Sequence, residues 1–309
     1  LGEREAVEAT LDLLLSKAEE ATSRRSSARA WVAAELRGLL ARLREGVMPI
    51  YEPGLDKLVE SNVGAGRLTF TTDLAEGIAG ASAIFIAVGT PSRRGDGHAD
   101  LSFVYAVAEE VGQNLSNEAV IVTKSTVPVG TGDEVERILR DSGTAHRFAV
   151  VSNPEFLREG AAIGDFKRPD RIVIGAEDEF GREVMREVYR PLFLNESPIL
   201  FTGRRTSELI KYAANAFLAT KITFINEMAD LCEKVGANVQ DVSRGIGMDN
   251  RIGSKFLHAG PGYGGSCFPK DTLALLKTAE DYDTPVRVVA AVVEANESRK
   301  RAMGRKVLD

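Results

Sequence analysis

The alternation of apolar and polar positions divides the chain into three zones. Residues 1–47 follow helical patterns and contain no strand pattern. From residue 49 to 202, short apolar runs alternate with helical patterns. From residue 204 onward the pattern is helical throughout. We therefore expect an atypical helical segment, an α/β domain and a helical domain, at residues 1–47, 48–203 and 204–309.

The predicted strands all lie in the middle zone, at residues 68–71, 84–88, 120–123, 148–151, 172–174 and 199–201. Helices are predicted between them at residues 102–115, 133–141 and 180–192. Because strand, helix and strand follow one another, this zone indicates an α/β fold with a doubly wound, mostly parallel sheet. The flanking zones carry longer helices, at about 3–22, 28–44, 207–235 and from 285 to near the end.

The helix over 207–235 has an apolar pattern along its whole length. Its apolar positions include Leu209, Tyr212, Ala216, Ala219, Phe224, Ile225 and Met228. Helices of this length at the end of an α/β domain usually form a subunit or domain interface. We expect a homodimer through this helix, and we expect Cys232, in the same pattern, to be an ordinary core residue.

The composition limits the classes of function. The chain has 309 residues, of which 44% are hydrophobic and 27% charged, and its net charge is −6. These values predict a soluble globular protein and argue against nucleic acid as a partner. The apolar runs are too short to cross a membrane, and no signal segment opens the sequence. With two cysteines and no metal-ligand spacing among His98, His146 and His258, we expect a cytoplasmic protein without metal or disulfides.

The run Gly260-Pro-Gly-Tyr-Gly-Gly-Ser-Cys-Phe-Pro-Lys-Asp271 carries the most specific chemistry. Its glycines allow the backbone to approach a ligand closely, and Lys270 favours the nucleophilic thiolate form of Cys267. The alternative is that Cys267 is only a small apolar residue packed beside a turn, but such a residue needs neither the glycines nor the lysine. Gly260-x-Gly262-x-x-Gly265 matches the dinucleotide fingerprint, but it does not follow a strand, so we interpret it as a substrate loop.

Polar turns follow three successive predicted strands. They are Val88-Gly-Thr-Pro91, Lys124-Ser-Thr-Val-Pro-Val-Gly130 and Asn153-Pro-Glu-Phe-Leu-Arg-Glu159. Ligands of open parallel sheets bind beyond the carboxyl ends of the strands. A single turn of this kind is ordinary, whereas three along one edge predict a binding rim.

Lys211 and Asn215 are spaced i, i+4 on the long helix and share a face. An ammonium and an amide side by side can stabilise a developing oxyanion. The alternative is a solvated lysine, but the apolar neighbours predict burial, where an idle lysine is costly. Asp271 and Glu155 could each act as a general base for water, although Asp271 also fits a helix N-terminus and Glu155 a surface charge. Cations that could pair with a diphosphate are Arg158, Arg168, Arg171, Arg251 and Lys255.

From Met48 to its end, the chain resembles the UDP-glucose/GDP-mannose dehydrogenase family, the NAD-dependent nucleotide-sugar 6-dehydrogenases. The matching runs are Phe85-Ile-Ala-Val-Gly-Thr-Pro91, Lys124 to Gly130, Asn153 to Gly160, Glu208-Leu-Ile-Lys-Tyr-Ala-Ala-Asn-Ala-Phe217 and Gly262 to Asp271. The Gly-Tyr-Gly-Gly-Ser-Cys-Phe form favours UDP-glucose as the substrate. The resemblance implies a Rossmann-like NAD-binding domain followed by an all-helical central dimerisation region.

The resemblance also implies a role for each matching residue. Cys267 would attack the 6-aldehyde formed by a first hydride transfer, and a second transfer would give a thioester that water hydrolyses to UDP-glucuronate. Lys211 and Asn215 would stabilise the oxyanions, and water would be positioned or activated by Glu155, Thr126 and Asp271. Contacts to NAD would come from Val88, Gly89, Thr90, Pro91, Ser125, Thr126 and Glu159. Contacts to the sugar nucleotide would come from Glu155, Phe156, Leu157, Arg158, Lys211, Asn215, Arg251, His258, Gly262, Tyr263 and Gly264.

Residues 1–47 depart from the family pattern. The family opens with a strand carrying Gly-x-Gly-x-x-Gly and a second strand ending in an acid, and neither is present there. The family's third domain is also absent from this sequence. We therefore expect encoded chemistry with impaired NAD binding. The alternative is a non-catalytic, dimerising module that binds a sugar nucleotide; a single-step hydroxyacid dehydrogenase leaves Cys267 unexplained.

Overall fold

The computed structural model describes residues 38, 41–43, 45, 48–93, 97–193 and 197–308. The helices expected over 3–22 and 28–44 therefore lie outside the described residues, apart from helical positions at 38 and 41–43.

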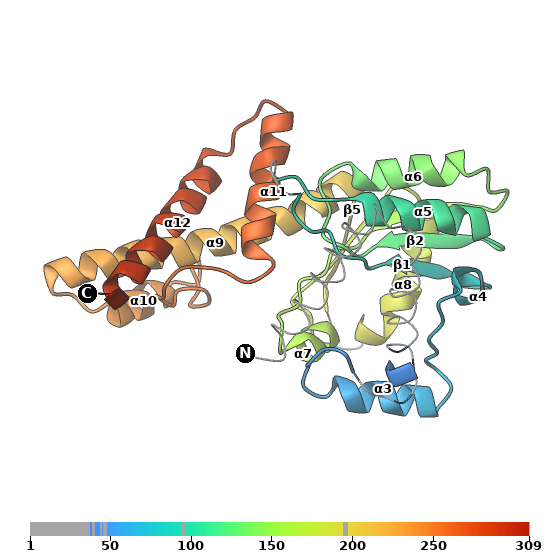
Figure 1. Ribbon diagram of the computed structural model, residues 1–309, viewed down its shortest axis with the longest axis horizontal. Coiled ribbons are helices and arrows are strands. Elements are labelled where there is room, and N and C mark those ends of the chain that lie inside the picture. The colour runs from blue at the N-terminus through green and yellow to red at the C-terminus, as the bar shows by residue number, and fades with distance from the viewer. Residues whose placement is uncertain are drawn as a thin grey trace, which may run out of the picture.

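A five-stranded sheet forms the centre of the first region (Figure 1). The strands are β1 (Ala83–Ile86), β2 (Ala119–Thr123), β3 (Phe148–Ser152), β4 (Ile172–Ala176) and β5 (Ile199–Thr202). They lie in the order β1-β2-β3-β4-β5. The first three are parallel, β4 runs antiparallel to β3, and β5 is parallel to β4. The expected α/β class with a mostly parallel sheet is confirmed.

Helices cover both faces of this sheet (Figure 1). On one face lie α5 (Ser102–Asn114) and α6 (Thr131–Asp141), and on the other lies α8 (Glu179–Phe193). All five residues of β2 are buried: Ile121 packs in the cluster with α5 and α6, and Val120 and Val122 pack in the cluster with α8. A central strand covered on both faces needs such a continuous apolar run.

Residues 68–71 do not form the strand that their apolar pattern predicts. In the described part of the chain, β1 is the edge of the sheet and pairs only with β2. Residues 68–71 therefore have no strand to pair with, and a strand needs hydrogen bonds to a neighbour whatever its side-chain pattern. The sequence also failed to predict several short helices: α3 (Leu55–Gly64), α4 (Leu74–Ile78), α7 (Ala162–Lys167) and α10 (Val239–Gly247).

The second region is helical, as expected. Its main elements are α9 (Arg204–Val235), α11 (Phe268–Asp281) and α12 (Arg287–Leu308). Figure 1 shows α9 running from the sheet into this region, with α11 and α12 beside it. Tyr212 and Ala216 of α9 are buried against Ala274 and Leu275 of α11. Cys232 is buried on α9, which confirms it as a core residue.

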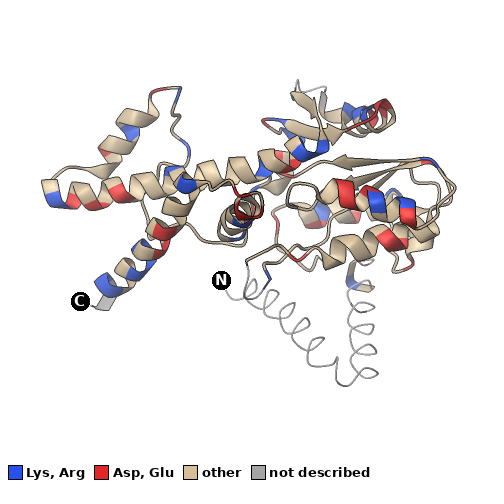
Figure 2. Ribbon diagram, turned by 90° about the horizontal axis from the view of Figure 1, so that it is seen from above, with Lys and Arg blue, Asp and Glu red and all other residues tan. Residues whose placement is uncertain are grey.

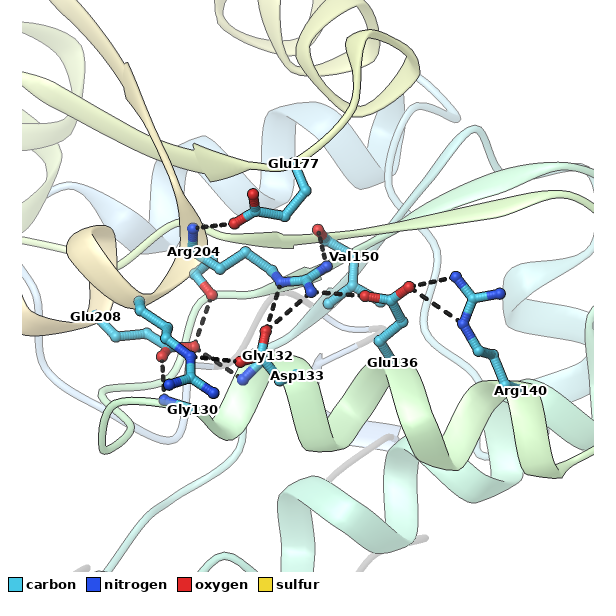
Figure 3. A network of polar contacts seen from close by, with 11 residues as sticks. Gly130, Gly132, Asp133, Glu136, Arg140, Val150, Glu177, Arg204 and Glu208 are labelled. Carbon is cyan, nitrogen blue, oxygen red and sulfur yellow. Dashed lines mark hydrogen bonds and ion pairs between the residues drawn. The ribbon is translucent and has the colours of Figure 1, made fainter.

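A polar network joins the start of α9 to the sheet region (Figure 3). The Arg204 guanidinium pairs with Asp133 at 2.9 Å and with Glu136 at 2.6 Å, both on α6. The Glu208 carboxylate accepts hydrogen bonds from the backbone N–H groups of Gly130 and Gly132, at 2.7 and 2.8 Å. Burial raises the pKa of Glu208, and these N–H donors oppose that shift. The N-terminus of α6 is thus capped by a side chain from α9.

Charges of both signs are mixed along the helices (Figure 2). Among the described helices, none combines the length and apolar character that a bilayer-spanning helix needs. Within the same residues, no group of three or more His, Cys, Asp and Glu side chains is placed to hold a metal ion.

Candidate active site

A cavity of about 730 Å³ lies where the sheet meets the helical region. Three parts of the chain form much of its lining: the turn over 153–159 after β3, the Lys211 face of α9, and residues 264–268 at the start of α11. Seven cationic side chains and four carboxylates line the cavity, although the whole chain carries a net charge of −6. This local excess of positive charge suits an anionic ligand.

Cys267 lies at the N-terminus of α11 and lines the cavity. It is a free, exposed thiol, and its Sγ lies 3.7 Å from the Ser266 hydroxyl. A helix N-terminus favours negative charge on a group or ligand that lies there. Ser266 in turn donates a 3.1 Å hydrogen bond to Glu159, which joins the cysteine loop to the turn after β3.

Asn215 lines the cavity, and Asp271 is its hydrogen-bond partner. The Asn215 side-chain amide donates a 2.6 Å hydrogen bond to Asp271, whose carboxylate is 1% exposed. Lys270 pairs with the other carboxylate oxygen at 2.6 Å. Asp271 does lie in the first turn of α11, but its carboxylate is tied to α9 and is not a solvated end charge. The Lys270 ammonium, expected to act on Cys267, is directed to Asp271.

Lys211 and Glu155 form the second polar pair of the cavity. Lys211 is 4% exposed, and its ammonium lies 3.2 Å from the Glu155 carboxylate. Burial of Lys211 agrees with the apolar pattern of its helix. Phe156 has Lys211 at 5.3 Å from its ring centroid and Arg171 at 4.0 Å, so two cations contact one aromatic ring.

Lys124 is a cavity residue to which the sequence reasoning gave no role. It follows β2, and its ammonium donates to the Asn153 side-chain oxygen and the Tyr189 hydroxyl, each at 3.2 Å. Burial lowers the pKa of Lys124 to about 8, while nearby Glu155 raises it and Lys211 lowers it. Its position in the same turn as Ser125 and Thr126 is the only sequence signal that could have identified it.

The predicted cofactor rim lies at the carboxyl ends of β1 and β2. The Thr90 hydroxyl donates to the Thr126 carbonyl at 2.8 Å, and the Ser125 hydroxyl donates to the Val88 carbonyl at 2.6 Å. These bonds bring the turns over 88–91 and 124–130 together, as expected. Neither turn lines the 730 Å³ cavity apart from Lys124. Thr126 therefore lies on the rim and is not among the residues that line the cavity with Cys267.

Only some of the other residues predicted to contact the sugar nucleotide line the cavity. Phe156, Leu157, Arg158 and Gly264 line the cavity, although the Arg158 guanidinium pairs with Asp165 at 2.6 Å. Arg251, His258, Gly262 and Tyr263 are not part of its lining. Arg251 is exposed and pairs with Asp249 at 2.6 Å.

Asparagine side chains hold the glycine-rich loop in place. Asn296 of α12 accepts from the Tyr263 N–H at 2.8 Å and donates to the Tyr263 carbonyl at 3.1 Å. Asn226 of α9 accepts from the Gly260 N–H at 2.8 Å. Gly262 has a φ of 127°, and a Cβ there would lie 2.8 Å from the Asn296 side-chain oxygen, so glycine is required. Sequence reasoning missed both asparagines because the contacts are long-range.

Comparison with known proteins assigns both regions of the chain to domains of one family. Residues 38–193 match the NAD binding domain of the UDP-glucose/GDP-mannose dehydrogenase family. Residues 205–298 match the central domain of the same family.

Individual relatives are also similar over most of this chain. UDP-glucose 6-dehydrogenase of Rhizobium meliloti (strain 1021) is 72% identical over 88% of this chain and 62% of its own length. The Pseudomonas aeruginosa protein of the same name is 52% identical over 85% of this chain and 59% of its own length.

Among solved structures, a UDP-glucose dehydrogenase from Pyrobaculum islandicum superposes with a TM-score of 0.81 at 43% identity, over 85% of this chain and 61% of that one. This chain thus spans less than two thirds of the length of these relatives. It belongs to the UDP-glucose/GDP-mannose dehydrogenase family.

Proposed function

We propose that this protein oxidises UDP-glucose to UDP-glucuronate with NAD, through a covalent adduct on Cys267. The observation that carries the proposal is the convergence of Cys267, Asn215 and the Lys211–Glu155 pair on one basic cavity, with Asp271 hydrogen-bonded to Asn215. The names of relatives that are 72% and 52% identical support UDP-glucose as the substrate. A diphosphate accounts for the positive charge of the cavity.

A chemical role can be assigned to each of these side chains from its position. The Cys267 thiolate would add to the aldehyde carbon, giving a thiohemiacetal whose oxyanion Lys211 and Asn215 stabilise. After oxidation the same carbon would remain bound to sulfur as a thioester. Water would then displace the thiolate and leave a carboxylate, with Asp271 or Glu155 accepting the proton of that water.

The residues of the rim fit one end of NAD, which when bound would accept the hydride of each oxidation. Gly89 faces open space at the carboxyl end of β1, where open parallel sheets bind ligands. The turns over 88–91 and 125–126 would hold the cofactor there, and Glu159 is a further proposed contact. Glu208 occupies the N–H groups at the start of α6, so that helix is not open to a pyrophosphate. The described residues thus support NAD binding at the rim. The start of α6 would not bind the pyrophosphate of NAD, because its N–H groups already donate to Glu208.

We infer a division of labour between the regions. Residues 48–203 would hold the cofactor, and residues 204–309 would carry the nucleophile. The non-catalytic alternative is not favoured, since the relatives are named as dehydrogenases.

The free thiols of Cys232 and Cys267 support a reducing compartment such as the cytoplasm.

We further propose that α9 pairs two copies of the chain. Phe217, Phe224 and Leu231 recur every seven residues on this helix and are 66%, 46% and 53% exposed. An apolar stripe of this length on one helix face fits a second copy of the same stripe. Light scattering should find a dimer, and Phe224→Asp should shift it to the monomer. A monomeric parent chain would contradict this proposal.

The proposed activity is tested by product analysis. The purified chain is incubated with UDP-glucose and NAD, and the nucleotide sugar is identified by mass spectrometry. UDP-glucuronate should form, and it should not form with Cys267→Ser. Cys232→Ser is the matched control, because that thiol is buried on α9 and should leave the product unchanged. Unaltered UDP-glucose after incubation with the parent chain would overturn the proposal.

A further inference from the structure

Lys124 is a half-buried cation without a carboxylate partner of its own. Its two hydrogen-bond partners, the Asn153 oxygen and the Tyr189 hydroxyl, are neutral. Tyr189 also donates to the Asn153 oxygen, and the Asn153 amide donates to the Val173 carbonyl at 2.7 Å. The orientation of Asn153 is therefore fixed. Lys124 is held at the cavity by two neutral hydrogen-bond acceptors in fixed positions.

The charges around Lys124 come from two other elements. Glu155, in the turn after β3, attracts its ammonium, and Lys211, on α9, repels it. Tyr189, on α8, stays neutral because burial raises its pKa to about 12. Lys124, Lys211 and Glu155 all line the cavity, so two ammonium groups face one carboxylate, which is paired with Lys211. Removing an ammonium from water is costly unless an anion compensates its charge, and here one carboxylate serves two ammonium groups.

We propose that Lys124 is a positioning residue that shares the Glu155 carboxylate with Lys211 and leaves this end of the cavity with a net positive charge. That charge favours a carboxylate, or a developing oxyanion, at the sugar carbon that is oxidised. It has little effect on the neutral hydroxyl of the unoxidised sugar. This inference rests on the proposed function, and it deepens it by assigning a residue that distinguishes the product from the substrate.

The charge on Lys124 is sensitive to pH. Because burial holds its pKa near 8, the ammonium is present at pH 7 and mostly lost at pH 9.5. An arginine at this position keeps its charge over the whole range. A methionine keeps much of the volume and carries no charge. The two substitutions therefore separate charge from packing.

The test measures binding, and it requires no turnover. UDP-glucose and UDP-glucuronate are titrated calorimetrically into the parent chain, Lys124→Met and Lys124→Arg at pH 7 and pH 9.5. The parent should lose roughly tenfold in affinity for UDP-glucuronate between the two pH values and should bind UDP-glucose almost equally at both. Lys124→Met should be weak for UDP-glucuronate at both pH values, and Lys124→Arg should stay tight at both.

The outcomes separate this inference from the proposed function. A parent chain that binds neither nucleotide sugar overturns the proposed function and this inference with it. Binding of both by the parent, with Lys124→Met unchanged or weakened equally for the two ligands, overturns the inference alone. If Lys124→Met does not fold, the pH dependence of the parent remains decisive, because equal UDP-glucuronate affinity at both pH values contradicts the role. Lys57→Met, on the exposed face of α3, is the control and should match the parent.

Discussion

The Asn215 amide donates a 2.6 Å hydrogen bond to the Asp271 carboxylate, and this bond ties the long helix α9 to the turn that carries Cys267. The bond joins residues 56 positions apart in the sequence. It holds Cys267, the proposed nucleophile, near the helix face that carries Lys211, and all three side chains line one cavity.

Asn215→Ala should reduce turnover far more than it reduces stability. The substitution removes the proposed oxyanion donor, which should lower kcat by roughly 10²–10³-fold. It also leaves a buried Asp271 oxygen without its partner, which destabilises by about 1–3 kcal/mol. Steady-state kinetics and urea unfolding measure the two effects.

Asn238→Ala provides the matched control for this prediction. The Asn238 side chain caps α10 and lies outside the cavity lining. Its loss should destabilise by about 1 kcal/mol and leave kcat unchanged. Equal losses of kcat in the two variants would show that Asn215 acts through stability alone.

Arg204→Met should destabilise the protein strongly because it breaks a buried network (Figure 3). The Arg204 side chain is 9% exposed, and its removal leaves Asp133 and Glu136 short of a cation. We expect a loss of about 3 kcal/mol in the free energy of unfolding. Arg205 shares Asp133, but its side chain is 63% exposed, so Arg205→Met should cost less than about 1 kcal/mol. Equal losses for the two arginines would contradict the buried network.

Lys124 should make stability depend on pH in the alkaline range. Its pKa in the folded chain is about 8, below the ordinary value of 10.5. Between these values the unfolded chain binds the proton and the folded chain does not, so the free energy of unfolding rises with pH. Relative to Lys124→Met, the parent should gain up to about 3 kcal/mol between pH 8 and 10.5. A constant difference between the two chains over this range would show that the Lys124 pKa is not lowered.

The sequence predicted the sheet well wherever a strand lies between two others. Val120 and Val122 belong to an apolar run that is buried on both faces, and such a run has few alternatives. Residues 68–71 have a similar pattern but no partner, because pairing depends on segments far away in the chain. The short helix α7 was missed for the same kind of reason: the N–H groups of Gly160 and Ala162, at its start, are bound by Glu52.

The site was predictable where its residues share a motif or a helix face. Lys211 and Asn215 lie one turn apart, and Cys267 and Asp271 do as well. Lys124 was missed because its proposed role depends on Asn153 and Tyr189, which lie 29 and 65 positions away. Arg251 was assigned to the ligand from its charge, whereas the structure pairs it with Asp249.

The most direct test of the central claim is the number of NADH molecules formed per UDP-glucose when the purified chain is given excess NAD. A covalent adduct on Cys267 allows two oxidations at one carbon, so the account predicts two NADH per sugar with the parent chain. It also predicts that Cys267→Ser abolishes this yield. One NADH per sugar, or two with Cys267→Ser at the parent's rate, would contradict the proposed role of Cys267.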